Sequence, residues 1–361
     1  MVSETKQEQE RNTSQSRTAL VHRTCRHLKN EHLGLRAPEF DFEGYWLFAL
    51  LEEGSPFRAV KMGFSVGRYE GRDLGVDVPG DPGNVLCVID LINEDDSISF
   101  STDAIRRHEI SQSPEGTDIL FGQLGRFRAN WPSLRFQMVE PGNDIRLDFE
   151  LRGKTVHWWP DLVLPGTYYR QFVCPDMELG GTIMVAGQTY SVTGMGAFDR
   201  PFGRLVKSPT SRGIGYWHYD VIAWEDRTTT LSWLVTDLAG ETVLNYGMGN
   251  IGQSELLLFE DFDIEYLEFE GRGEGIHLPR KWRAVLSGED GRLDYQVEAL
   301  GQEFDPGNPR ESFLLPSLIL SCRGTLTTPH GDELTLKGMG LPEYHVAHLG
   351  PLDLDSDRQS K

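Results

Sequence analysis

One segment of the chain combines strand-forming residues with a side chain that could act as an acid. Residues 181–203, GTIMVAGQTYSVTGMGAFDRPFG, alternate apolar and polar residues around an Ala-Gly-Gln turn, which predicts a two-stranded ribbon. Its end carries Asp199 between Phe198 and Arg200. Burial against aromatic rings raises the pKa of a carboxyl and makes it a proton donor. The alternative is a structural acid paired with Arg200 or Arg204.

A second set of polar residues lies on a predicted strand that begins near Tyr216. Alternation places Tyr216, His218 and Asp220 on one face of this strand. The other face carries Trp217 and Tyr219. His218 and Asp220 are two positions apart, about 7 Å between Cα atoms, so they could share a substrate or a water molecule. The structural alternative is a histidine held by a backbone carbonyl, with Asp220 solvated at a barrel rim.

Glu343 is a further candidate acid, close to the C-terminal end of the chain. It follows a Gly-x-Gly sequence at residues 338–340. It can be a general acid that faces a pocket, or an acid that satisfies backbone donors where the last strand ends. We expect Asp199 to be the catalytic acid, with His218, Asp220 and Glu343 as supporting polar groups.

Aromatic residues near these polar groups predict the walls of an apolar pocket. Such rings bury apolar ligands, and a well-placed ring stabilises a cation by about 0.5–2 kcal/mol. A register error of one residue would exchange the two faces of each strand. The predicted substrate-binding residues are Phe198, Tyr216, Trp217, Tyr219 and Trp233.

The elements that must position these residues are short strands. The 39 glycines and 19 prolines are spread along the 361 residues, which favours many strands joined by turns over long helices. We therefore predict an all-β fold with two lipocalin-like β-barrel or sandwich domains in tandem. The expected boundaries are a disordered tail at 1–22, domains at 23–176 and 177–350 with a linker at 167–178, and a disordered tail at 351–361.

Composition excludes several classes of partner. The net charge of −20 argues against binding to nucleic acid or to anionic lipid surfaces. The polar N-terminus lacks the apolar core of a signal peptide, and we find no apolar run long enough to span a membrane. The four cysteines form no Cys-x-x-Cys pair. We expect a cytoplasmic protein with reduced thiols, no metal site, and an apolar small molecule as its partner.

One glycine motif has the spacing of a dinucleotide site. Residues 247–252 read Gly-x-Gly-x-x-Gly, but an acidic, strand-like segment follows at 256–262. A dinucleotide site requires a helix at that point, within a βαβ unit. We therefore expect no nucleotide and no other cofactor.

The order of these motifs resembles that of double-lipocalin proteins of the hydroxyneurosporene synthase, or carotenoid hydratase, type, which include lipocalin-like, Diels-Alderase-like natural-product cyclases. Two positions differ, since Phe198 stands where the family often has Trp and Arg200 stands where His is common. The resemblance is carried by residues 181–203, 215–220, 277–282 and 338–343, and more loosely by 43–46 and 158–161.

This resemblance implies a cofactor-independent hydratase (a hydro-lyase) or a cyclase (an isomerase) that acts on an isoprenoid or polyene. A hydratase requires a carboxylic acid that protonates an alkene before water captures the cation. A pericyclase needs a shaped pocket and hydrogen-bond donors such as His218, Tyr216 and Tyr219. A third hypothesis is a non-catalytic carrier of an apolar metabolite, which would tolerate Asp199→Asn.

Overall fold

The structure is a computed structural model of the whole chain, and it describes the main strands and their turns. The predicted tails at 1–22 and 351–361 lie outside the described residues. The described residues are 33–35, 42–67, 84–93, 98–106, 110–140, 142, 144–153, 157–158, 162–164, 167–205, 214–237, 239–251, 255–271, 277–301, 313–314 and 318–346.

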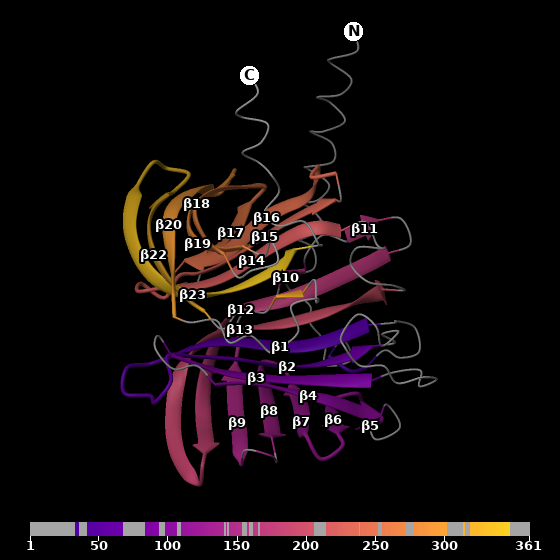
Figure 1. Cartoon of the computed structure of the whole chain (residues 1–361). Helices are drawn as coiled ribbons and strands as arrows, with labels where there is room; N and C mark the ends of the chain where they lie inside the picture. The colour runs from indigo at the N-terminus through magenta and orange to yellow at the C-terminus, as the bar shows by residue number, and fades with distance from the viewer. Residues whose placement is uncertain are drawn as a thin grey trace.

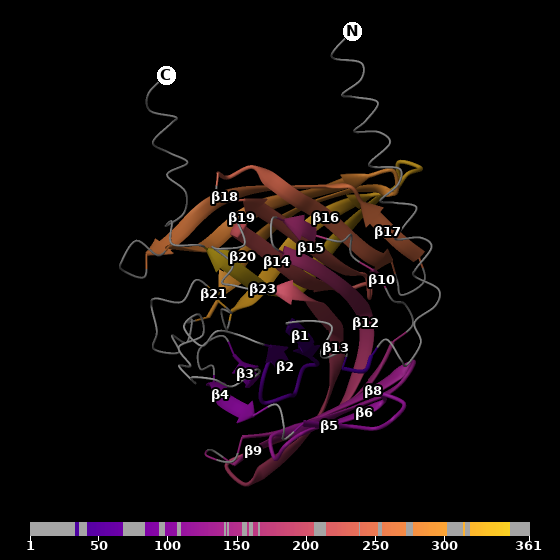
Figure 2. The same cartoon turned by 90° about the vertical axis from the view of Figure 1, so that its right-hand side faces the viewer.

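Two curled sheets lie one above the other in Figure 1, and Figure 2 shows the same two bodies from the side. All regular elements of the described residues are strands, which confirms the predicted all-β fold. The first sheet contains β1 (Phe42–Leu51), β2 (Ala59–Gly67), β3 (Asn84–Ile92), β4 (Ile98–Arg106), β5 (Ile110–Gln112), β6 (Asp118–Phe121), β7 (Gly125–Asn130), β8 (Ser133–Glu140), β9 (Ile145–Arg152), β10 (His157–Trp158), β11 (Leu162–Leu164), β12 (Thr167–Val185) and β13 (Gln188–Leu205).

The second sheet is formed by the C-terminal strands. Its order is β17-β16-β15-β14-β23-β22-β20-β19-β18, and β21 pairs with β23. The first sheet has the order β4-β3-β2-β1-β13-β12-β9-β8-β7-β6-β5, and β10 and β11 pair with β12. The second-sheet strands are β14 (Ile214–Trp224), β15 (Thr229–Asp237), β16 (Thr242–Ile251), β17 (Glu255–Phe259), β18 (Asp261–Gly271), β19 (His277–Gly288), β20 (Gly291–Leu300), β21 (Phe313–Leu314), β22 (Ile319–Thr327) and β23 (Glu333–Val346).

Each sheet curls around its own apolar core. In the first sheet, the rings of Phe64 (β2) and Phe121 (β6) stack with centroids 4.0 Å apart, although these strands are far apart in the sheet order. In the second sheet, Trp224 (β14) meets Tyr295 (β20) edge-on at 5.8 Å. These contacts across the interior define two lipocalin-like barrels, as predicted.

A third apolar cluster joins the outer faces of the two sheets, and we call it the junction layer. It draws residues from β1, β3, β12 and β13 of the first sheet and from β14, β15, β16 and β23 of the second. Phe48 and Tyr219 meet across it with ring centroids 5.8 Å apart. Because strand side chains alternate between faces, strands such as β1, β13 and β14 contribute both to a barrel core and to the junction layer. Members of this layer include Trp46, Phe48, Val173, Ala197, Tyr219, Val221, Trp233, Tyr246 and Leu341.

The predicted two-stranded ribbon is confirmed as β12 and β13. Ala186 and Gly187 have φ angles of 50° and 79° at the turn between them, as a tight hairpin with right-handed strand twist requires. The ribbon is longer than expected, since β12 has 19 residues and β13 has 18.

The ribbon also contains the segment expected as a linker. Residues 167–178 belong to β12, which pairs with β13 along its length and with β9. The sequence placed the start of the second domain at residue 177, whereas the second sheet begins at Ile214. The physical reason is that glycine and proline in this ribbon do not break it. Strand β12 accommodates Pro175 at an irregularity in its pairing with β13, where the register shifts between Cys174 and Met177.

Candidate functional site

Asp199 lies in the junction layer, on the face of β13 that also carries Ala197. It stands opposite Trp46 on β1 and Val173 on β12, and only 5 % of its surface is exposed. Burial raises the pKa of its carboxyl well above the ordinary range; a hydrogen bond from Gln171 opposes this shift, and the nearby Glu343 adds to it. Burial therefore favours the protonated form of Asp199, which is the form that a general acid requires.

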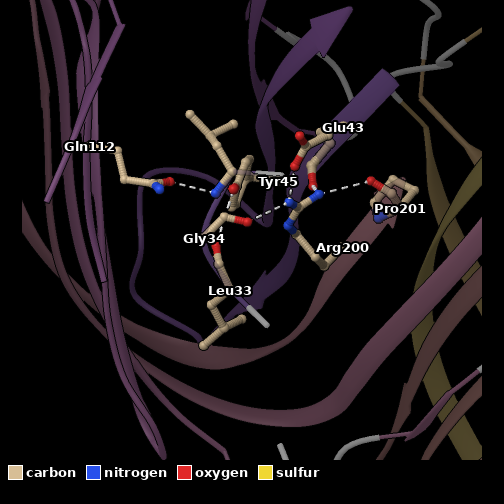
Figure 3. A network of polar contacts seen from close by, with 9 residues as sticks. Leu33, Gly34, Glu43, Tyr45, Gln112, Arg200 and Pro201 are labelled. Carbon is tan, nitrogen blue, oxygen red and sulfur yellow. Dashed lines mark hydrogen bonds and ion pairs between the residues drawn. The ribbon is translucent and has the colours of Figure 1, made fainter. Parts of the chain in front are cut away.

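Arg200 does not form the ion pair with Asp199 that was the structural alternative. Its side chain enters the first barrel, where its guanidinium pairs with the buried carboxylate of Glu43. It also donates to the carbonyl of Gly34 at 3.0 Å and to that of Pro201 at 3.1 Å, and lies 4.2 Å from the ring centre of Tyr45. Figure 3 shows this network. Arg200 therefore holds the segment before β1 against the barrel.

Glu343 reaches the junction from the second sheet. One of its two predicted roles placed it where the last strand ends, but it lies inside β23, opposite Tyr219 on β14. Its side chain is partly buried. Burial raises the pKa of Glu343 to about 7, against opposing contributions from Lys61 and from the Trp217 indole. An acid with this pKa exists in both protonation states at neutral pH, so it can donate or accept a proton.

A buried ion pair faces Glu343 from the first sheet. Lys61 on β2 and Asp90 on β3 lie 3.9 Å apart with almost no exposed side-chain surface, and they are cross-strand neighbours. Sequence reasoning missed both, although each is the only charged residue in an apolar run, AVKMGFSV or VLCVIDLI. An isolated charge in such a run is the signal that could have found them, because buried charges need partners.

Three of the predicted wall residues lie in the junction layer with the two acids. Trp217 and Tyr219 on β14 and Trp233 on β15 belong to this cluster. The sequence missed Trp46 and Tyr246, which belong to it as well. They lie on β1 and β16, and the sequence could not say which face of these strands would meet the other sheet.

Phe198 lies on the opposite face of β13 from Asp199. Its ring is fully buried in the core of the first barrel, where it stacks on Phe127 at 5.6 Å and contacts Phe136 at 5.7 Å. The aromatic surroundings of Asp199 therefore come from Trp46 across the strand pair and not from its sequence neighbour.

His218, Asp220 and Tyr216 are also separated from Asp199. They share one face of β14, as alternation predicted, but this face points into the second barrel. His218 Nε2 lies 2.8 Å from Asp220 Oδ2, and its Nδ1 lies 3.1 Å from the Tyr216 hydroxyl and 2.9 Å from that of Tyr266. The nine predicted site residues thus fall into a junction group, a second-barrel group and the isolated Phe198.

Two absences concern the described residues only. Among them, no group of three or more His, Cys, Asp or Glu side chains could hold a metal ion. No helix within the described part of the chain is long and apolar enough to cross a membrane.

Two curled sheets, each closed on its own core and joined back to back, define an all-β protein of the double-lipocalin type. No family model and no curated protein matches the sequence. Solved structures do match. Kievitone hydratase from Nectria haematococca is 13 % identical, with 90 % of this chain and 94 % of that chain covered and a TM-score of 0.59.

Two further structures match over similar lengths. CghA, solved with Sch210972, is 11 % identical over 85 % of this chain and 89 % of that chain, with a TM-score of 0.57. A protein from Nitrosomonas europaea, provisionally named AttH, is 14 % identical, with 85 % of this chain and 96 % of that chain covered and a TM-score of 0.56. The double-lipocalin resemblance predicted from the sequence is therefore confirmed in the fold.

Proposed function

We propose that this protein is a cofactor-independent hydratase or cyclase that acts on an apolar isoprenoid or polyene in the junction layer. The observation that carries this proposal is the Asp199 carboxyl, which is almost fully buried among apolar side chains and has a raised pKa. A neutral carboxylic acid in an aromatic environment can protonate an alkene, which water at neutral pH cannot do at a useful rate.

The first chemical step transfers a proton from Asp199 to one alkene carbon. The two π electrons form the new C–H bond, and the other carbon becomes a tertiary cation. The faces of Trp217 and Tyr219, which lie in the same layer, stabilise this cation by about 0.5–2 kcal/mol per well-placed ring. The Asp199 carboxylate that remains is the counter-ion.

The second step decides between the two reactions. In hydration, a water oxygen bonds to the cation, and its extra proton returns to a carboxylate. Glu343 can accept that proton, because its pKa of about 7 leaves it partly ionised at neutral pH, and transfer of a proton from Glu343 to the Asp199 carboxylate restores the acid. In cyclisation, a second alkene of the same substrate attacks the cation, and loss of a neighbouring proton to Asp199 restores the acid.

The similar structures support this reaction class. Kievitone hydratase is named for a hydration, and CghA was solved with the small molecule Sch210972. The layer of Trp, Tyr and Phe side chains at the junction supports an apolar substrate, because such surfaces gain free energy when water is excluded.

The experiment is mass spectrometry of products formed from linear polyenes and isoprenoids in oxygen-18 water. We expect heavy oxygen in a product for hydration, or a product of unchanged mass with a new retention time for cyclisation. Asp199→Asn should abolish either product, while Asp263→Asn, an exposed acid on β18, should change neither. Turnover that survives in Asp199→Asn would favour a pericyclase, and retention of a substrate without turnover would favour a carrier.

A further inference from the structure

A chain of hydrogen bonds runs through the interior of the second barrel, away from the junction layer. The hydroxyls of Tyr216 (β14) and Tyr266 (β18) contact each other. Both approach His218 Nδ1, at 3.1 Å and 2.9 Å. The other ring nitrogen, Nε2, lies 2.8 Å from Asp220 Oδ2. Two strands that are not neighbours in the sheet order, β14 and β18, thus meet in one polar network, which we call the relay.

The relay leads from the surface to the barrel core. Tyr216 and Tyr266 each keep part of their surface exposed, whereas His218 and Asp220 have none. Next to Tyr266, the ring of Phe269 lies 5.4 Å away and is 38 % exposed. The side chains of Tyr216 and Tyr266, with the aromatic neighbour Phe269, therefore lie closer to the surface than His218 and Asp220.

The direction of the hydrogen bonds depends on the protonation of His218. When its ring is neutral, Nε2–H donates to Asp220 and Nδ1 accepts from one tyrosine, which accepts from the other. The outermost hydroxyl then offers only lone pairs outward. When the ring is protonated, Nδ1–H donates to one tyrosine hydroxyl. Both hydroxyls then reverse their hydrogen-bond direction, so that the outermost hydroxyl donates outward. The same groups can therefore accept or deliver one proton.

Several buried polar atoms beside the relay have no partner among the described residues. They are Asp220 Oδ1, Trp282 Nε1 and the Tyr344 hydroxyl. The rings of Trp282 and Tyr344 lie 5.3 Å and 4.9 Å from that of His218. A network built for stability alone pairs its buried polar groups, because an unpaired one is costly in a medium of low dielectric constant. The polar groups around His218 are therefore not arranged for stability alone.

The groups that face the relay from the other strands keep it free of additional charge. Burial raises the pKa of Tyr344 (β23), Tyr295 (β20) and Cys322 (β22) well above their ordinary values, so they are neutral at physiological pH. The charge of Arg280 on β19 opposes this shift in the pKa of Tyr344. Asp220 is thus the carboxyl group that faces His218 within the described part of the barrel.

We propose that the relay is a second acid–base site, which binds the hydroxyl of a phenol or enol at the Tyr216–Tyr266 pair and exchanges one proton with it. The ligand O–H bond breaks as its proton passes to the outer tyrosine. That tyrosine passes its own proton to the inner one, which gives its proton to His218 Nδ1. The ligand becomes a phenolate or enolate, and the imidazolium is paired with Asp220. The reverse transfer restores the start.

The test uses 4-nitrophenol, whose absorbance distinguishes phenol from phenolate. We expect saturable binding to the full chain and a shift of the bound probe toward phenolate. Tyr216→Phe or Tyr266→Phe should weaken binding about tenfold, the equivalent of one lost hydrogen bond. His218→Gln should retain binding but abolish the shift toward phenolate. Tyr190→Phe on β13 is the matched control and should behave as the wild type.

Three results would overturn the proposal: no binding to the wild-type chain, binding as tight as that of the wild type in both Tyr→Phe variants, or a phenolate shift that survives in His218→Gln. If a variant unfolds in a thermal scan, histidine NMR of the wild-type chain replaces it, and the His218 signal must move when the probe is added. Asp199→Asn should leave 4-nitrophenol binding unchanged, so a failure of the junction site and a failure of the relay are distinguishable.

Discussion

Asp199 and Arg200 are adjacent in β13, but their side chains leave opposite faces of the strand. Arg200 enters the first barrel and pairs with Glu43, whereas Asp199 enters the junction layer next to Gln171. The cation that could have neutralised the acid is therefore held by another carboxylate. Arg200 still lowers the pKa of Asp199 through its charge and a backbone hydrogen bond, but burial raises this pKa by more and favours the protonated form.

The pH dependence of turnover should reflect the protonated form of Asp199. Because the pKa of this acid is raised, the proton donor persists to higher pH than an ordinary carboxylic acid and is lost as the pH rises through the raised pKa. We expect kcat of the wild-type protein to fall as the pH rises through this value. Glu343→Gln should move this fall to lower pH, because the nearby Glu343 raises the pKa of Asp199. Steady-state rates across the pH range would check both expectations, and a rate that rises toward alkaline pH would contradict them.

Stability should decrease between about pH 4 and pH 7 because of the two junction acids. Below this window both the folded and the unfolded chain hold these protons. As the pH rises, the unfolded chain releases them first, since burial raises the folded pKa of Glu343 to about 7 and that of Asp199 as well. At about 1.4 kcal/mol per pKa unit, Glu343 contributes at most about 3 kcal/mol to this decrease.

Urea unfolding of the wild type and of Asp199→Asn at both ends of this window would measure the effect. The variant lacks one of the two carboxyls, so its free energy of unfolding should decrease less with rising pH than that of the wild type. Asp263→Asn corrects for the general effect of removing an acid from a chain of net charge −20. Equal pH slopes for all three proteins would show that Asp199 titrates normally.

The Arg200–Glu43 pair should be among the most costly to break. Both side chains are buried, so Glu43→Gln leaves an uncompensated cation inside the barrel and should lower the free energy of unfolding by about 3–5 kcal/mol. The exposed pair Arg135–Asp148, with a separation of 2.7 Å, is the control, and Asp148→Asn should cost about 0–1 kcal/mol. Thermal and urea unfolding measure both, and similar losses would contradict the structural role of Arg200.

Gly196 should resist substitution because β13 lies close to β1 at this position. A Cβ atom at Gly196 would lie 2.6 Å from the Phe48 carbonyl oxygen, so Gly196→Ala must push the two strands apart. We expect a loss of about 1–3 kcal/mol in the free energy of unfolding. Gly180 in β12 has open space at its Cβ position, and Gly180→Ala should be tolerated. If Gly196→Ala and Gly180→Ala unfolded at the same denaturant concentration, this result would argue against the close approach of β13 and β1 at Gly196.

Much of the fold follows from local pattern. The alternation from Tyr216 to Asp220 correctly predicted which residues share a face, and the ribbon around Ala186 was recognisable from its turn and flanking strands. These features depend on neighbours within a few residues, so they can be predicted without the rest of the chain. The position of the boundary between the sheets could not be predicted in this way, because the pairing of β12 with β9 and β13 is not visible in the sequence of β12 alone.

The sequence by itself determined the strands, their alternating faces and the acids that could do chemistry. Only the tertiary structure decided which face meets a barrel core and which meets the other sheet. That choice placed Asp199 and Glu343 together in the junction layer and sent His218 and Asp220 into the second barrel. The physical reason is that every one of these strands is buried on both sides, so hydrophobicity alone cannot distinguish the two faces. The contacts that distinguish them join distant parts of the chain, such as Phe48 with Tyr219 and His218 with Tyr266.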